Sequence, residues 1–306
     1  MNQPFLSHGG RARVPFARLA LVLACSAFAL AGGTARAATG APKPPQVKLE
    51  LEKYTLPNGL EVILHEDHQL PLVAVNIWYH TGPANERAGQ TGFAHLFEHL
   101  MFQSSGHVPE DSYFKYLEAA GSSFVNGSTD FDRTNYLEDV PSNQLELALW
   151  LESDRMGFLL DRLTAASFAN QQDVVRNERR QSVENAPYGL VEEELYHQLF
   201  PKTHPYYASV IGSHEDIQNA KVEDVREFFK SYYVPNNATL VIAGDIDKAK
   251  TKALVTKYFA TIPRGENLPA IEATTPPITQ ERRAKVTDKV ELPRVFMGWI
   301  TSPIFK

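Results

Sequence analysis

The sequence predicts an α+β fold, a two-layer unit in which helices pack on one face of a mostly antiparallel sheet. The first observation is an Asn58-Gly59 turn between two short apolar runs, 51–56 and 60–64, a pattern typical of a β-hairpin. The second is a set of later runs rich in β-branched and aromatic residues, which we expect to be strands: 72–79, 122–128, 133–139 and 238–244. The third is a series of longer stretches with helical periodicity.

These helical stretches interleave with the strands and are, in chain order, 91–102, 109–121, 141–158, 164–185, 191–199, 222–233 and 248–260. The second stretch places Tyr113 and Leu117 one turn apart, and the third places Leu145, Leu149 and Met156 on one apolar stripe. Strands interleaved with long helices favour the α+β class.

Length and composition indicate a globular protein. The chain has 306 residues, enough for one large domain or two ordinary ones, and is 43% hydrophobic and 22% charged. The net charge of −6 provides no basic surface of the kind that binds nucleic acid.

The N-terminus reads as a secretory signal peptide over residues 1–37. Arg11, Arg13 and Arg18 precede an apolar run at 19–31, and Ala35-Arg36-Ala37 forms an A-x-A cleavage site. We therefore expect a protein exported to the periplasm or secreted. The run is too short to span a membrane comfortably, so no span is expected after the signal is removed.

Cys25 is the only cysteine and lies inside this leader. Lipidation at Cys25 is an alternative, although the apolar stretch before it is short. The exported chain would hold no disulfide and no cysteine ligand, so its metal ligands would have to be His, Asp or Glu.

The remaining chain divides into four predicted segments. Residues 38–50 read as a linker, 51–262 as a catalytic domain and 263–283, rich in Pro, Thr and Glu, as a second linker. A strand pattern resumes over 284–301, and we interpret residues 284–306 as the start of a second homologous domain that is incomplete. The sequence therefore suggests a fragment, or one half of a two-part machine.

The predicted helix 91–102 carries three polar side chains on one face. At about 100° per residue, His95 and His99 lie about 40° apart, with Glu98 about 60° from His95 on the other side. The other positions are apolar nearly all round, which is typical of a buried helix: Phe93, Leu96, Phe97, Leu100, Met101 and Phe102. Two His at i and i+4 can bind one zinc ion, with the Glu between them placed to act as a base.

The alternative is a structural role, in which both His hydrogen-bond the backbone and Glu98 forms an ion pair. Burying two imidazoles and a carboxylate without partners costs roughly several kcal/mol of folding free energy. A divalent metal satisfies all three groups together. Glu178 shares a helical stripe with Val174 and Val175, a position suited to a third metal ligand. On that pattern alone, an exposed Glu in an ion pair is the simpler interpretation.

The string His95-Leu96-Phe97-Glu98-His99 is the inverted zinc-protease motif. With its surroundings it resembles the pitrilysin/insulysin family of inverzincin metallopeptidases, in the branch of the processing peptidases. Segments 54–60, 92–102, 173–180 and 233–238 carry the resemblance, together with Asn126. Two positions depart from the family pattern, with Gln171 where a second Glu is common and Gly127 where Ala is usual.

The resemblance implies a zinc-dependent metalloendopeptidase with the same two-layer fold and one Zn²⁺ ion. It implies His95, His99 and Glu178 as metal ligands, Glu98 as general base toward a metal-activated water, and Asn126 on an edge strand that binds the peptide substrate. It also implies a homologous C-terminal half or a partner subunit. The alternative is a non-catalytic or partner-dependent subunit of a peptidase heterodimer, although such subunits usually lose the His-Glu-His set.

Overall fold

The computed structural model describes residues 48–303 except 269, 272 and 276. The predicted signal peptide, Cys25 and most of the first predicted linker lie outside the described residues. Among the described residues, no helix combines the length and apolar character needed to cross a membrane.

A six-stranded sheet runs in the order β1-β2-β6-β3-β5-β4. Only β2 and β6 pair in parallel, and the other four neighbouring pairs are antiparallel, as predicted. The hairpin at Asn58-Gly59 is confirmed, because Leu51 pairs with His65 and Thr55 with Glu61. The strands are β1 Leu51–Thr55, β2 Glu61–Glu66, β3 Leu72–Tyr79, β4 Phe124–Asp130, β5 Arg133–Pro141 and β6 Ala238–Gly244.

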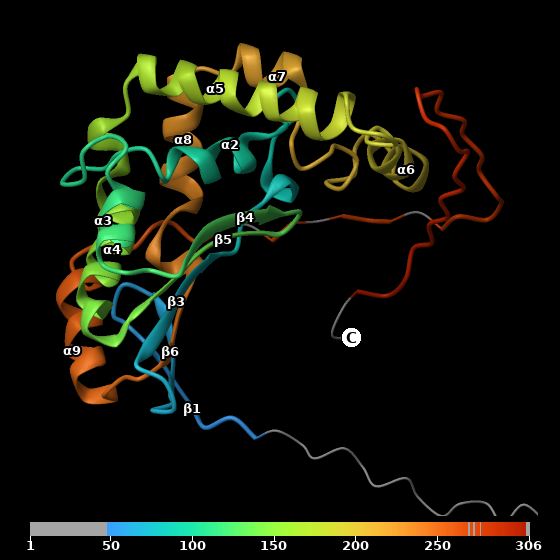
Figure 1. The fold of residues 1–306 in the computed structure, drawn as a ribbon. Coiled ribbons are helices and arrows are strands. Elements are labelled where there is room, and N and C mark those ends of the chain that lie inside the picture. The colour runs from blue at the N-terminus through green and yellow to red at the C-terminus, as the bar shows by residue number, and fades with distance from the viewer. Residues whose placement is uncertain (1–47, 269, 272, 276, 304–306) are drawn as a thin grey trace, which may run out of the picture. The chain divides into compact units, whose positions relative to one another are not determined.

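The α-helices are α2 Phe93–Leu100, α3 Tyr113–Ala119, α4 Leu145–Arg162, α5 Ala165–Arg179, α6 Val191–Leu199, α7 His214–Asn219, α8 Val222–Tyr232 and α9 Lys248–Phe259. In Figure 1 they gather on one side of the sheet. Strand β3 shows the same asymmetry, since Val73, Val75, Ile77 and Tyr79 are fully buried while Trp78 is exposed. The predicted α+β fold, with helices on one face, is therefore confirmed.

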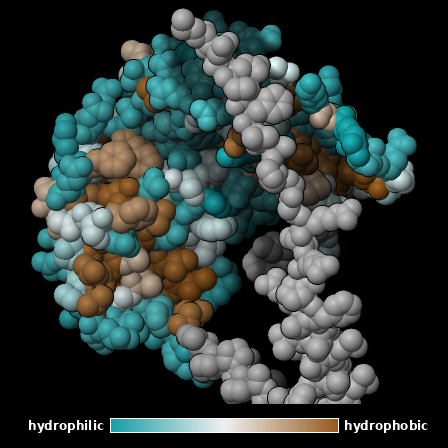
Figure 2. All heavy atoms as spheres, turned by 45° about the vertical axis from the view of Figure 1, so that its right-hand side comes forward, coloured by the Kyte–Doolittle hydropathy of each residue, from teal (hydrophilic) through white to brown (hydrophobic). Residues whose placement is uncertain are grey.

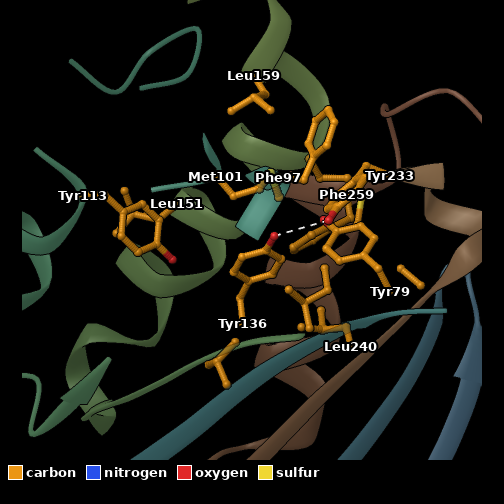
Figure 3. Close-up of a cluster of buried hydrophobic side chains, with 14 of the residues drawn as sticks. Tyr79, Phe97, Met101, Tyr113, Tyr136, Leu151, Leu159, Tyr233, Leu240 and Phe259 are labelled. Carbon is orange, nitrogen blue, oxygen red and sulfur yellow. Dashed lines mark hydrogen bonds between the residues drawn. The ribbon is translucent and has the colours of Figure 1, made fainter. Parts of the chain in front are cut away.

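The core lies where α2 and α8 meet the covered face of the sheet. Figure 3 shows Phe97 of α2, and Met101 directly after that helix, beside Tyr79, Tyr136 and Tyr233. The rings of Phe97 and Tyr233 stack with centroids 5.2 Å apart. This apolar side of α2 fixes the helix against the sheet and determines which way its polar side points.

Two predicted helices are shorter or shifted, for backbone reasons. Helix α3 begins four residues after Pro109, because Asp111 adopts a left-handed φ of 55° that no helix can include. Strand β5 extends to Pro141, opposite Leu72, so α4 begins only at Leu145. The short helix α7 was not predicted.

The predicted helix 164–185 is two elements. The α-helix ends at Arg179 and a π-helix continues over Arg180–Glu184. A π turn widens the backbone and is frequent at functional sites.

The strand pattern expected at 284–301 forms no strand. The described part of 263–303 holds neither helix nor strand, because none of its backbone pairs with a neighbouring strand. Several of its apolar side chains are exposed, among them Leu292, Val295 and Trp299. In the view of Figure 2, hydrophobic patches lie among hydrophilic side chains.

Candidate metal centre and active site

The N-terminus of α2 is fixed by side chains from two other segments. Glu86 accepts hydrogen bonds from the backbone N–H groups of Gly92 and Ala94, which have no partner within the helix. Thr91 Oγ1 donates to Asp216 Oδ2 at 2.5 Å and accepts from the backbone N–H of Ser213 at 3.0 Å. These bonds, together with the buried apolar side of α2, hold the polar side of the helix in place.

His95 and His99 meet Glu178 of α5 on that polar side. Their Nε2 atoms lie 3.3 Å apart, and Glu178 Oε2 lies 3.7 Å from Nε2 of His95 and 3.2 Å from Nε2 of His99. They form the one group of three potential metal ligands among the described residues. The structure therefore brings together the three residues that the sequence and the resemblance nominated as ligands.

The spacing of these three donor atoms fits a zinc ion. Zn²⁺ binds His nitrogen and carboxylate oxygen at about 2.0–2.1 Å in a tetrahedron, which places neighbouring donors about 3.3 Å apart. The observed 3.2–3.7 Å separations match that edge. Two His and one carboxylate also leave a fourth position open, as catalytic zinc sites do.

The protonation states suit metal binding. Burial, followed by the neighbouring His99, lowers the pKa of His95 to about 4, so its imidazole is neutral at pH 7. The contact with His99 lowers the pKa of Glu178, which keeps its carboxylate ionised. Neutral imidazole and ionised carboxylate are the forms that ligate metals.

Glu98 lies beside this group and is oriented by strand β4. Thr129 Oγ1 donates to Glu98 Oε2 at 2.6 Å. A Cβ at Gly127 would lie 2.9 Å from Glu98 Cγ, so this glycine leaves room for the carboxylate. Burial raises the pKa of Glu98, and the bond from Thr129 opposes that rise.

Asn126 is exposed on the same strand, but the structure does not bring it into the cluster. Successive side chains of a strand point to opposite faces. Because Gly127 and Thr129 face Glu98, Asn126 points to the other face. Strand β4 is an edge of the sheet, as the resemblance implied.

A cavity of about 400 Å³ opens onto the cluster and is lined by His95, Glu98 and Glu178. Its remaining walls come from the β4–β5 turn, the segment after α5, helix α6 and the loop before α7: Thr129, Phe131, Ser182, Val183, Gly189, Glu192, Glu193, Tyr196, Ser209, Val210 and Ile211. The space is large enough for side chains of a peptide.

Thr129, Glu86 and the walls of the cavity were not predicted from the sequence. Thr129 had a usable signal, because strand alternation places 125, 127 and 129 on one face of the predicted strand 122–128 once that strand is extended. Glu86 and the residues at 209–211 lie in loops whose contacts depend on tertiary packing, and no local pattern identifies them.

Two family descriptions match this chain. "Insulinase (Peptidase family M16)" matches residues 61–211, which include the cluster, and "Peptidase M16 inactive domain" matches residues 219–305.

Curated relatives carry the name zinc protease. Zinc protease PqqE of Helicobacter pylori is 32% identical over 212 residues, covering 69% of this chain and 47% of that protein. Probable zinc protease PqqL of Escherichia coli is 27% identical over 218 residues, covering 68% of this chain and 23% of that protein. The chain therefore spans less than half the length of either relative.

Solved structures share the fold. A protease from Helicobacter pylori superposes with a TM-score of 0.71 at 30% identity, covering 74% of this chain and 55% of that one. The periplasmic protease PqqL from Escherichia coli superposes with a TM-score of 0.67 at 21% identity, covering 74% of this chain and 26% of that one. A peptidase M16 inactive domain from Pseudomonas fluorescens superposes with a TM-score of 0.64 at 20% identity, covering 73% of this chain and 53% of that one. With two family descriptions matched along most of its length and relatives of the same kind, the chain belongs to the insulinase-like peptidase family M16.

Proposed function

We propose that this chain is a zinc-dependent metalloendopeptidase that hydrolyses peptides, with His95, His99 and Glu178 as ligands of one Zn²⁺ ion and Glu98 as general base. The observation that carries the proposal is the convergence of three donor atoms within 3.7 Å of one another beside a fourth, separately oriented carboxylate. A purely structural cluster would not require Glu98 to be held apart from the other three by Thr129.

Each group has a distinct task. When bound, zinc supplies a Lewis acid that polarises the scissile carbonyl and acidifies a water molecule. Glu98 takes the proton from that water and passes it to the leaving amine. The Thr129 hydroxyl fixes the rotamer of Glu98, so that one carboxylate oxygen is occupied and the other is free for proton transfer.

Strand β4 offers a binding edge for an extended substrate. Among the described residues it pairs with β5 on one side only, so its other edge can accept an added strand. A peptide bound there would run past Gly127 and Thr129, and therefore past Glu98. Asn126, on the face of β4 away from Glu98, would contact such a peptide.

The signal-peptide pattern supports export to the periplasm or the exterior, and one relative is described as a periplasmic protease. Because this chain spans less than half of the length of PqqE and of PqqL, we further propose that a homologous C-terminal half or partner subunit completes the enzyme.

A second candidate is a non-catalytic or partner-dependent subunit. The match of 219–305 to a family description named inactive domain, and the similar fold of an inactive domain, favour it. The retained set of His95, Glu98, His99 and Glu178 favours the enzyme, since a scaffold has no use for it.

Glu98→Gln distinguishes the two candidates. We expect the variant to bind zinc as the wild type does and to cleave a fluorogenic, unstructured peptide at least about a thousandfold more slowly, because general-base catalysis contributes about 10²–10⁴-fold. Equal cleavage by the variant and the wild type would refute the role of Glu98. Zinc binding without cleavage by the wild type, even with a C-terminal partner chain added, would favour the non-catalytic subunit.

A further inference from the structure

Helix α6 and the loop at 209–211 form two walls of the cavity. Helix α6 contributes Glu192, Glu193 and Tyr196 to the lining, yet none of its residues is buried. The other wall is the loop at 209–211, which contacts α2 through the close approach of Ile211 and Gly212 to Gly92. Tyr196 of α6 packs on Phe131 with ring centroids 4.8 Å apart, and polar contacts add to this partly buried packing.

Arg179 supplies these contacts for both walls. Its side chain is only 9% exposed, and Nη2 donates to Glu193 Oε2 of α6 at 2.9 Å. Nη1 of the same guanidinium donates to the backbone carbonyl of Gly212 at 2.7 Å. A third contact joins Nε to Glu184 Oε1 at 3.4 Å.

The position of Arg179 in the chain makes these contacts informative. It directly follows Glu178, so the residue that reaches the metal cluster and the residue that holds the walls are adjacent. Between α5 and α6 the backbone is irregular, with the π-helix Arg180–Glu184 and a left-handed Tyr188 at φ 65°. Such a connection does not fix the direction of α6 as a continuous helix would.

We propose that Arg179 is a positioning residue for the peptidase site, which holds α6 and the 209–212 loop against the helix of Glu178 and thereby sets the width of the substrate cavity. The inference rests on the proposed function for its effect on substrate. Arg179 does not touch the metal cluster or the reacting atoms, so it acts through Glu193 and Gly212.

The test compares Arg179→Gln and Arg179→Lys with the control Arg180→Gln. Arg180 is the adjacent residue and carries the same charge. Within the described residues, the hydrogen bond of its guanidinium goes to the side chain of Asn177. All variants are made in the full chain, with zinc content measured for each. Hydrogen exchange is then followed at 191–199 and 209–212.

We expect Arg179→Gln to speed exchange in both walls and to leave residues 165–178 and zinc content unchanged. In the zinc-loaded Glu98→Gln background, binding of a labelled unstructured peptide should weaken about tenfold or more, as expected for the loss of charge-assisted hydrogen bonds. Arg179→Lys should recover part of the affinity, because lysine keeps the charge but lacks the planar guanidinium that donates to two partners at once. In the active protein the change should appear mainly in KM, and Arg180→Gln should match the wild type.

A double variant keeps the inference falsifiable if Arg179→Gln alone is unstable. If Arg179 acts through Glu193, then Arg179→Gln with Glu193→Gln should weaken peptide binding no more than the stronger single change. Additive losses, or unchanged exchange at 191–199 in Arg179→Gln, would overturn the inference. Failure of the wild type to cleave peptides would contradict the proposed function instead, because exchange decides the role of Arg179 without any cleavage.

Discussion

Glu178 Oε2 lies 3.2 Å from Nε2 of His99, although helix α3, the β4–β5 hairpin and the long helix α4 separate their two helices in the chain. The distance equals the edge of a tetrahedral zinc site within about a few tenths of an ångström. Glu192 lines the same cavity on α6 but forms no such contact. Comparing Glu178 with Glu192 therefore distinguishes a carboxylate that binds the metal from one that only lies in the same cavity.

Glu178→Ala should reduce zinc affinity by more than about a hundredfold, because even outer-shell partners of metal ligands contribute about 10–100-fold. Glu192→Ala removes a carboxylate from the same cavity and should leave one zinc per chain. Elemental analysis after dialysis against a weak chelator measures both. Equal zinc retention in the two variants would contradict the assignment of Glu178 as a ligand.

Thr129→Val should slow peptide cleavage about tenfold, because a hydrogen bond to a charged group contributes about 1.5–3 kcal/mol and valine cannot make it. Thr129→Ser keeps the hydroxyl and should retain most of the rate. Steady-state kinetics with a fluorogenic peptide provide the comparison, and zinc content should be the same in both. A Thr129→Val variant as fast as Thr129→Ser would show that the bond to Glu98 at 2.6 Å does not matter for the reaction.

Comparing Gly92→Ala with Gly89→Ala separates the cost of backbone strain from the cost of a steric clash at the start of α2. Both glycines have a left-handed φ, 87° and 82°, so alanine is strained at each. Only at Gly92 would the new Cβ also lie 2.6 Å from a backbone atom, the carbonyl oxygen of Ile211, whereas at Gly89 nothing lies within 4 Å.

We therefore expect Gly92→Ala to lower the free energy of unfolding by at least about 1 kcal/mol more than Gly89→Ala, the cost of overpacking a fixed contact. Urea unfolding at one pH and salt concentration measures the difference. Equal losses would mean that the 209–212 loop moves away freely from α2.

The sequence could predict the features that depend on local geometry. A helix fixes the relation of His95, Glu98 and His99 whatever surrounds it, and an Asn-Gly turn fixes its own hairpin. Glu178 is different, since its helical pattern alone favoured an exposed side chain, and only the resemblance nominated it. The structure places its carboxylate 3.2 Å from Nε2 of His99.

The rest depends on contacts between distant segments. The central place of β6, inserted between β2 and β3, follows from pairing across most of the chain, which no local pattern encodes. The bond from Thr129 to Glu98 and the contacts of Arg179 likewise join separate elements. The strand expected at 284–301 failed because a strand pattern forms a strand only when a partner strand accepts its hydrogen bonds.

The core holds a buried group of charged side chains from α4 and β5, and its effect on the free energy of unfolding should depend on pH. Arg155 of α4 donates to Glu152, which also accepts from Tyr113, and the guanidinium lies 4.3 Å from the ring centre of Tyr136. Glu138 of β5 is fully buried beside them, and both of its carboxylate oxygens lack a hydrogen-bond donor in the described chain. Burial, reinforced by the nearby Glu152, raises the pKa of Glu138 well above its ordinary value, so the side chain is neutral in the folded protein.

Glu138→Gln should therefore reduce the loss of stability at alkaline pH. In the unfolded chain Glu138 releases its proton above pH ~4.5, whereas in the folded chain it keeps the proton, so its contribution to the free energy of unfolding falls as pH rises through neutrality, by up to about 1.4 kcal/mol per pH unit. Glutamine has nearly the same shape and no proton to lose, so the free energy of unfolding of the variant should fall less steeply as pH rises through neutrality. Urea unfolding at constant ionic strength measures the slope, with Glu118→Gln, an exposed carboxylate on α3, as the control for removing one charge. Parallel curves for wild type and Glu138→Gln would mean that Glu138 is ionised in the folded protein and that Arg155 neutralises both carboxylates.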